Sequence, residues 1–291
     1  MTDAILEQTL NGLMMGSIYV LVALGMVLIY GVMQVVNFAH GVLFTAGGYL
    51  AHFFYTRVLD SYPLAILLSM VSLAAIGIAI ERGIFRPLSG NLRNQVIASL
   101  GLILAIENLV VALWGPNALQ FKVPTTEMLV SVGELRFSVH HLGIIVITLA
   151  MVALLGLFLK FTRFGTAIRA TSQSREAAMV VGIPVERVHW STFAIGTMLA
   201  ALGGALIGPL FLVFPQMGDV PLVKGLAGIL LGGMGSVPGA VVGGMIIGVV
   251  ESVSTLYLPT DYRDSIAFLA MVAILLARPQ GIFGVRMRGE D

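Results

Sequence analysis

The chain has 291 residues, of which 58% are hydrophobic and only 11% charged, and its formal net charge is +1. Soluble domains carry about 25% charged residues, so this composition excludes a water-soluble enzyme and a disordered chain. The near-neutral charge offers no field that would attract nucleic acid, and the absence of cysteine excludes disulfides and thiolate metal sites. What remains is a polytopic membrane protein.

Apolar runs divide the chain into candidate membrane segments, each of which needs about 20 mostly apolar residues. Six runs meet this requirement, at residues 11–33, 37–56, 63–80, 95–114, 141–160 and 190–213. Three later runs are short or interrupted by glycine, at residues 222–234, 236–256 and 264–277. We therefore predict an all-α, transmembrane helical bundle of eight or nine segments, some of them broken, in which residues 1–291 form a single domain.

The distribution of basic residues predicts the orientation. Eleven of the sixteen Lys and Arg residues lie in the loops 81–94 and 160–189 or after residue 277. Cytoplasmic loops carry an excess of these residues, so we expect the C-terminus inside and the N-terminus outside. The other five are expected in loops on the opposite side, at Arg57, Lys122, Arg136, Lys224 and Arg263.

Between the first two runs, a Gly-flanked interruption carries Asn37 and His40, with Gly31 before them and Gly41 after them. Backbone that leaves a helix inside a bilayer must be buried in protein or line a wet cavity. Broken helices of this kind often shape transport paths, so we expect Asn37 and His40 to border such a path. The alternative is that they bond to the frayed helix ends and only hold the kink.

Two carboxylates fall inside apolar runs, Glu107 and Glu251. An acid within lipid is costly, so each is a candidate for the transport path. The alternative for each is a structural pairing with a nearby Arg or with a helix end.

The basic loop at residues 161–189 contains a short helix with both ends marked. Ser174 is a good N-cap, and Glu176 lies in the first turn, where the helix dipole favours an acid. Gly182 supplies a left-handed closing residue, and Pro184 prevents continuation. A helix of two turns is marginal alone in water, so we expect it to dock on a soluble partner. A solvated loop helix is the alternative.

Small residues recur at intervals of three or four in the last third of the chain, at Gly232, Gly235, Gly239 and Gly243. Such spacing lets membrane helices pack backbone to backbone, and this is the favoured interpretation. The alternative is that a break around Ser236 forms a gate or contacts a partner.

The residues Arg175-Glu176-Ala177-Ala178 followed by Gly182 contain a pattern that resembles the EAA motif of ABC importer permeases. In that family the motif docks in a cleft of the ATPase subunit. The resemblance therefore assigns ATPase coupling to Ser174, Arg175, Glu176, Ala177, Ala178 and Gly182.

Four further stretches resemble LivH-type branched-chain amino-acid permeases. They are Asn37-Phe-Ala-His-Gly41, Glu81–Leu88 (ERGIFRPL), Gly232–Gly244 (GGMGSVPGAVVGG) and Arg278–Gly284 (RPQGIFG). The resemblance covers about residues 9–284. It implies an inner-membrane permease for leucine, isoleucine and valine that works by alternating access. It also implies three kinds of partner: a LivM-like second permease, two cytoplasmic ATPases and an extracytoplasmic binding protein.

Other functions stay open at this point. Permeases for urea, short amides or other amino acids share these motifs. An ion-coupled secondary transporter would use Glu107 and Glu251. A membrane-embedded enzyme lacks any assembled nucleophile, base or metal set, and no G-x-x-x-x-G-K-[ST] loop is present to bind nucleotide. We expect neither a cofactor nor a nucleic-acid partner, and hydrolysis of ATP is expected in the partner subunits.

Overall fold

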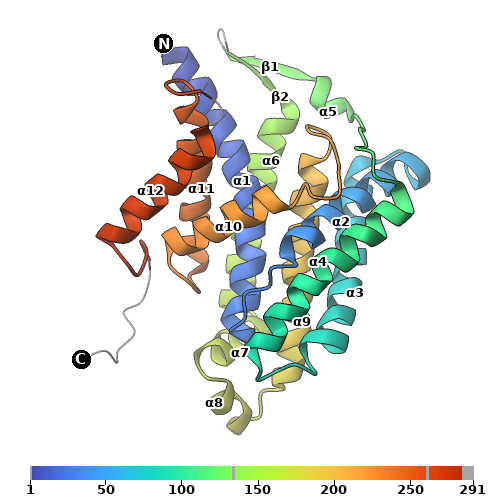
Figure 1. The fold of residues 1–291 in the computed structure, drawn as a ribbon, viewed down its shortest axis with the longest axis vertical. Helices are drawn as coiled ribbons and strands as arrows, with labels where there is room; N and C mark the ends of the chain where they lie inside the picture. The colour runs from blue at the N-terminus through green and yellow to red at the C-terminus, as the bar shows by residue number, and fades with distance from the viewer. Residues whose placement is uncertain (1, 133–134, 260–261, 284–291) are drawn as a thin grey trace.

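The computed structural model describes residues 2–132, 135–259 and 262–283, and most of them are helical (Figure 1). The α-helices are α1 (Thr2–Met33), α2 (His40–Phe53), α3 (Tyr62–Ile80), α4 (Leu92–Trp114), α5 (Pro124–Glu127), α6 (Val139–Phe161), α7 (Arg163–Gln173), α8 (Arg175–Val180), α9 (Val185–Ile207), α10 (Asp219–Gly232), α11 (Val237–Ser254) and α12 (Arg263–Ala277). Two π-helical turns, η1 (Phe54–Val58) and η2 (Glu81–Phe85), extend α2 and α3.

Six of these helices are long and apolar enough to cross a membrane: α1, α3 with η2, α4, α6, α9 and α11. The prediction of a polytopic helical membrane protein is therefore confirmed. The other candidate segments are shorter, because α2, α10 and α12 have 14, 14 and 15 residues.

One predicted boundary is wrong, and the description of the fold needs an addition. The run 190–213 ends as a helix at Ile207, because Pro209 and Pro215 cannot continue a helix and the chain turns away between them. The description as all-α is also incomplete, since the loop 115–139 contains a short antiparallel hairpin of β1 (Leu129–Val132) and β2 (Leu135–Ser138), with Leu129 paired to Ser138.

Burial separates a central pair of helices from an outer layer. In the apolar windows of α1 and α9, 89% and 78% of the residues are buried, whereas the values for α4 and α6 are 11% and 17%. The exposed side chains of α4 and α6 are largely Leu, Ile, Val and Phe. A helix that is apolar on its outer face suits contact with lipid, so α4 and α6 belong to the outer layer around α1 and α9.

Glycine lets the central helices approach their neighbours closely. A Cβ atom on Gly204 of α9 would lie 2.0 Å from the carbonyl oxygen of Phe44 in α2. One on Gly248 of α11 would lie 2.4 Å from the Cα atom of Gly16 in α1. Membrane helices gain little from excluding lipid, so van der Waals contact at such points holds the bundle together.

We expect Gly204→Ala to lower the thermal unfolding midpoint of the detergent-solubilised protein, because the added methyl group overpacks the α2–α9 contact at a cost of about 1–3 kcal/mol or more. Gly101→Ala is the matched control, since a Cβ atom there meets nothing within 4 Å. Equal midpoints for the two variants would contradict the close-contact interpretation.

Candidate coupling helix and transport path

The helix α8 has the capped ends that the sequence predicts. The Ser174 hydroxyl oxygen accepts a hydrogen bond from the Ala177 N–H at 3.2 Å. At the other end, Gly182 has a φ of +79°, and its N–H donates to the Met179 carbonyl at 3.0 Å. The Ile183 N–H donates to the Ala178 carbonyl at 2.9 Å. Side-chain and backbone bonds therefore satisfy both ends of this short helix.

The outer surface of α8 is apolar and unpartnered among the described residues. Ala178 is buried against the protein, but Met179, Val180 and Val181 are exposed, Val180 by 87%. These three residues are consecutive, and Figure 1 shows α8 at one end of the molecule. This makes α8 a candidate interaction site.

Charged side chains brace the start of α9 next to α8. Arg86 pairs with Glu186 of α9 at 3.3 Å and with the fully buried Glu81 of η2 at 3.1 Å. The Arg82 guanidinium lies 5.1 Å from the centre of the Trp190 ring. These contacts tie the loop after α3 to the base of α9.

The break after α1 is built by the residues that the sequence singled out. Gln34 ends α1 in a left-handed conformation with a φ of +56°, which is unfavourable for a residue with a side chain. The Asn37 side-chain oxygen then accepts a hydrogen bond from the Ala39 N–H at 3.1 Å, within the turn that precedes α2. The Asn37 amide nitrogen has no hydrogen-bond partner among the described residues.

His40 opens α2 and is completely buried. Its ring lies between α1 and α9, since a Cβ atom on Gly25 would be 2.5 Å from the His40 Nε2 atom. Neither ring nitrogen has a hydrogen-bond partner within the parts of the chain that the structure describes.

A second broken element meets the first. Residues 208–218 between α9 and α10 are not helical, apart from turns. A Cβ atom on Gly218 would lie 1.9 Å from the Gly41 carbonyl oxygen, and the Gly218 N–H donates to the Thr45 hydroxyl at 3.0 Å. The beginnings of α2 and α10 are thus in direct contact inside the bundle.

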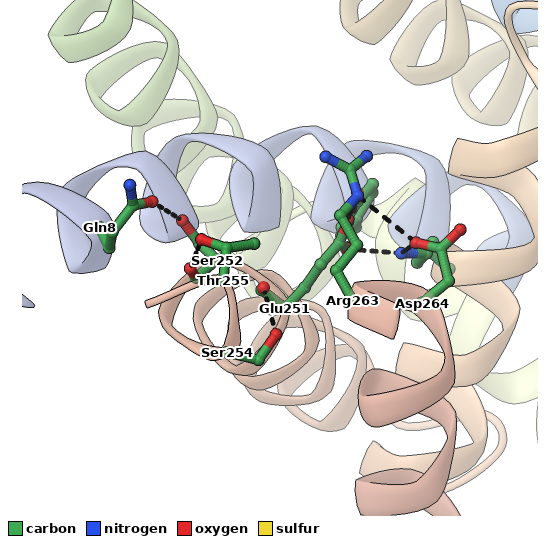
Figure 2. Close-up of polar contacts among 9 residues, drawn as sticks. Gln8, Glu251, Ser252, Ser254, Thr255, Arg263 and Asp264 are labelled. Carbon is green, nitrogen blue, oxygen red and sulfur yellow. Dashed lines mark hydrogen bonds and ion pairs between the residues drawn. The ribbon is translucent and has the colours of Figure 1, made fainter. Parts of the chain in front are cut away.

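Glu251 lies in a cluster of charges that joins α1, α10, α11 and α12 (Figure 2). Its carboxylate is 2.6 Å from the Lys224 Nζ atom and 3.2 Å from the Arg263 Nε atom, and it accepts a hydrogen bond from the Tyr19 hydroxyl at 3.0 Å. Lys224 also pairs with Asp264 at 2.6 Å. Opposite charges in contact remove most of the penalty for burying each of them.

Lys224 corrects one expectation from the sequence. It was expected in a loop, but it lies on α10 with only 2% of its side chain exposed. The helix α10 begins at Asp219, and the predicted run 222–234 already included position 224, so the loop assignment conflicted with that run. Three residues that the sequence analysis used at the C-terminal end lie outside the described residues: Gly284, Arg286 and Arg288.

Glu107 lies on α4 within its apolar window, partly exposed. Its surroundings therefore differ from those of Glu251, which is buried between Lys224 and Arg263.

The glycines of the last third serve two purposes. A Cβ atom on Gly232 would be 1.9 Å from the Gly239 carbonyl oxygen, and one on Gly243 would be 2.0 Å from that of Gly228, so α10 and α11 pack backbone to backbone. Gly235, with a φ of +83°, belongs to the turn between them. The Ser236 hydroxyl caps α11 by accepting a hydrogen bond from the Gly239 N–H at 3.1 Å.

Six long apolar helices, two broken elements that meet inside the bundle and a short capped helix at one end define a multi-pass membrane permease. The chain belongs to the family described as branched-chain amino acid transport system / permease component, which it matches over residues 8–275. As a permease subunit of the plasma membrane it is a transport protein, not an enzyme.

The names of individual relatives are consistent with this family assignment. The chain is 32% identical to the LivH high-affinity branched-chain amino acid transport system permease of Salmonella typhimurium, over 96% of this chain and 95% of that relative. It is 33% identical to BraD of Pseudomonas aeruginosa, with the same coverage. A shorter match, 30% identical over 49% of this chain and 43% of the relative, is to the autoinducer 2 import permease LsrC of Escherichia coli. No solved structure matches.

We expect Lys224→Met to lower the unfolding midpoint in detergent strongly, because removal of one partner from a buried ion pair costs about 3–5 kcal/mol. Lys122→Met is the control, since Lys122 and Glu127 form a 3.5 Å pair with both side chains 69% exposed, and exposed pairs contribute about 0–1 kcal/mol. The double variant Lys224→Met/Glu251→Gln should recover part of the loss. A midpoint for Lys224→Met equal to that of Lys122→Met would argue against the cluster.

Proposed function

We propose that this chain is the membrane-spanning permease of an ATP-driven importer for leucine, isoleucine and valine. The observation that carries the proposal is the similarity to LivH and BraD across 96% of the chain, which includes both broken elements and the α8 loop. In this assignment the partners are a LivM-like second permease, two cytoplasmic ATPases and an extracytoplasmic binding protein.

The helix α8 is the coupling element in this proposal. Its caps keep it folded, and Met179, Val180 and Val181 offer an apolar contact that an ATPase cleft would cover. Arg175, Glu176 and Ala177 are exposed beside this patch. A movement of the ATPases would therefore be passed to the permease through α8 and, after a short connection, through α9.

The orientation follows from the same helix. If α7 and α8 face the cytoplasm, the N-terminus of α1 faces outward, because Figure 1 shows it at the opposite end of the molecule. Eight or nine membrane segments are accounted for by the six long helices, the shorter α2 and α12, and α10, which packs against α1. With nine crossings, the end of α12 lies on the cytoplasmic side.

The transport path in this proposal runs beside the two broken elements. Asn37 and His40 hold polar atoms that have no hydrogen-bond partner among the described residues, and Glu107 carries an acid at membrane depth. Glu251 is held by Lys224 and Arg263, so we assign it to the packing of α10, α11 and α12 rather than to the path.

Other cargo within the same class is the second candidate, since LsrC is named for autoinducer 2 import. Urea, short amides and other amino acids belong to this alternative. An ion-coupled transporter that uses Glu251 is disfavoured, because the side chains of Lys224 and Arg263 already pair with that carboxylate.

The test is uptake of labelled leucine by proteoliposomes that contain this chain, the second permease and the ATPases, with the binding protein supplied on the side that takes up leucine. We expect uptake to require ATP and to be competed by isoleucine and valine. Val180→Asp should abolish both uptake and co-purification of the ATPases, because it places a charge in the apolar contact.

Thr166→Asp, at an exposed position on α7, is the matched control and should leave both unchanged. Leucine uptake driven by a proton gradient without ATPases would contradict the proposal. Competition by urea or amides but not by valine would favour the second candidate.

We expect His40→Gln to reduce leucine uptake at least about tenfold while the folded yield stays close to that of the natural protein, since glutamine keeps a polar group of similar length. His52→Gln, on the same helix, is the control. Full transport by the His40 variant would mean that the residue only holds the kink.

A further inference from the structure

An apolar cavity lies between α3, α6 and α9. Its volume is about 230 Å³, and every side chain that lines it is apolar. An empty cavity of this size would deprive its walls of van der Waals contacts, so an occupant is favoured. The lining includes Met70 of α3, Met151, Leu155 and Phe158 of α6, and Met198 and Leu199 of α9.

The cavity opens toward lipid. Leu155 and Leu199 form a buried floor, whereas Leu154 at the rim is 58% exposed. Nearby side chains of the same helices, Val71 of α3 and Leu157 of α6, are exposed and also apolar. Both helices are long and apolar enough to cross a membrane, so acyl chains of the bilayer surround this opening.

An acyl chain is the occupant that suits the lining. Apolar cavities of about 150 Å³ stay dry and bind apolar molecules, so water is a poor occupant here. Met70, Met151 and Met198 have unbranched side chains that adapt to irregular shapes. A flexible hydrocarbon tail fills such a space without leaving a polar group unpaired.

The helices that line the cavity each carry a basic residue at the end of the molecule where α7 and α8 lie. These residues are Arg82 in η2, which extends α3, Lys160 at the end of α6 and Arg187 in the first turn of α9. The Arg82 guanidinium lies 5.1 Å from the centre of the Trp190 ring, so the end of α3 and the start of α9 are together. All three basic side chains are exposed, and none has an acidic partner among the described residues.

The spacing between these charges and the cavity matches the depth of one lipid leaflet. Arg187 precedes Ile195 of the cavity wall by eight residues, which is about 12 Å along a helix. Lys160 follows Met151 by nine residues, or about 14 Å. Half of a hydrocarbon core that is about 30 Å thick is about 15 Å, so a lipid with its tail in the cavity has its phosphate at the level of these charges.

The charges also select the class of lipid. Basic residues between membrane helices recognise anionic headgroups, whereas a zwitterionic headgroup has no net charge to attract. Trp190 adds an aromatic ring of the kind that is enriched at headgroup level.

We propose that the cavity between α3, α6 and α9 is a binding site for an anionic phospholipid of the leaflet on the α7–α8 side. One acyl chain fills the cavity, and the phosphate pairs with Arg82, Lys160 and Arg187. The site depends on neither the cargo nor the partner subunits, so it goes beyond the proposed function. A bound lipid joins α6 to α3 and α9 and stabilises the folded chain.

The first experiment tests the headgroup. The unfolding midpoint of the purified full chain in detergent is measured while phosphatidylglycerol or phosphatidylcholine is added. We expect phosphatidylglycerol to raise the midpoint at lower concentration than phosphatidylcholine. The double variant Lys160→Gln/Arg187→Gln should need at least about tenfold more phosphatidylglycerol for the same rise.

The matched control is Arg57→Gln/Arg93→Gln, which removes two exposed charges from helices that do not line the cavity. It should respond to phosphatidylglycerol as the natural protein does. Equal responses to the two lipids, or an equal loss in both double variants, would overturn the proposal.

The second experiment tests the cavity. Met151→Trp and Met198→Trp each place a large ring in the space of the acyl chain, and we expect the response to phosphatidylglycerol to be lost. Leu157→Trp, at a side chain that is 54% exposed outside the cavity, should keep it. Two cavity variants are used so that one poorly folded protein does not decide the result, and an unchanged response in a folded cavity variant would overturn the proposal.

The third experiment identifies the occupant and uses the natural absence of cysteine. Leu154→Cys at the rim and Leu157→Cys outside it are labelled with a benzophenone maleimide in membranes that contain the complete transporter. After illumination, we expect adducts from position 154 to be enriched in anionic phospholipid relative to those from position 157. Adducts with another protein chain at position 154, or the same lipid composition at both positions, would overturn the proposal.

Discussion

Direct contact between helix backbones is the constraint on which this structure depends. In lipid there is no water to drive apolar helices together, so the bundle must gain its stability from close packing and from satisfied polar groups. Glycine makes that packing possible where α1 meets α11, where α2 meets α9 and where α10 meets α11. The charge cluster around Lys224 then joins α12 to the same assembly.

The regular helices and the two broken elements have different roles in the bundle. The regular helices α3, α4 and α6 present apolar side chains outward, while the non-helical segments before α2 and α10 bring polar atoms to the interior and to one face. A transporter needs such a contrast, because a bundle of continuous apolar helices offers no polar route. The irregular segments are held by specific bonds, such as those of Asn37 and Thr45, rather than left loose.

The sequence predicts much of this arrangement, since apolar length and helix caps are local properties. The six long helices, the caps of α8 and the break at Asn37 follow from neighbouring residues. The sequence did not predict the burial of Lys224, because its partners Glu251 and Asp264 lie far along the chain and meet it only after folding. Glu81 was placed in a loop motif, yet it is fully buried, because Arg86 five residues later neutralises it.

The direct succession of α8 and α9 has a mechanical consequence. Four residues separate the end of α8 at Val180 from the start of α9 at Val185, and the cap at Gly182 keeps that connection stiff. A straight helix of 23 residues is about 34 Å long, so a tilt of about 10° at its base displaces its far end by about 6 Å. Since α9 touches α1, α2 and α3, a small rotation imposed on α8 in the proposed coupling would reach these helices as a displacement of several ångströms at the opposite end of α9.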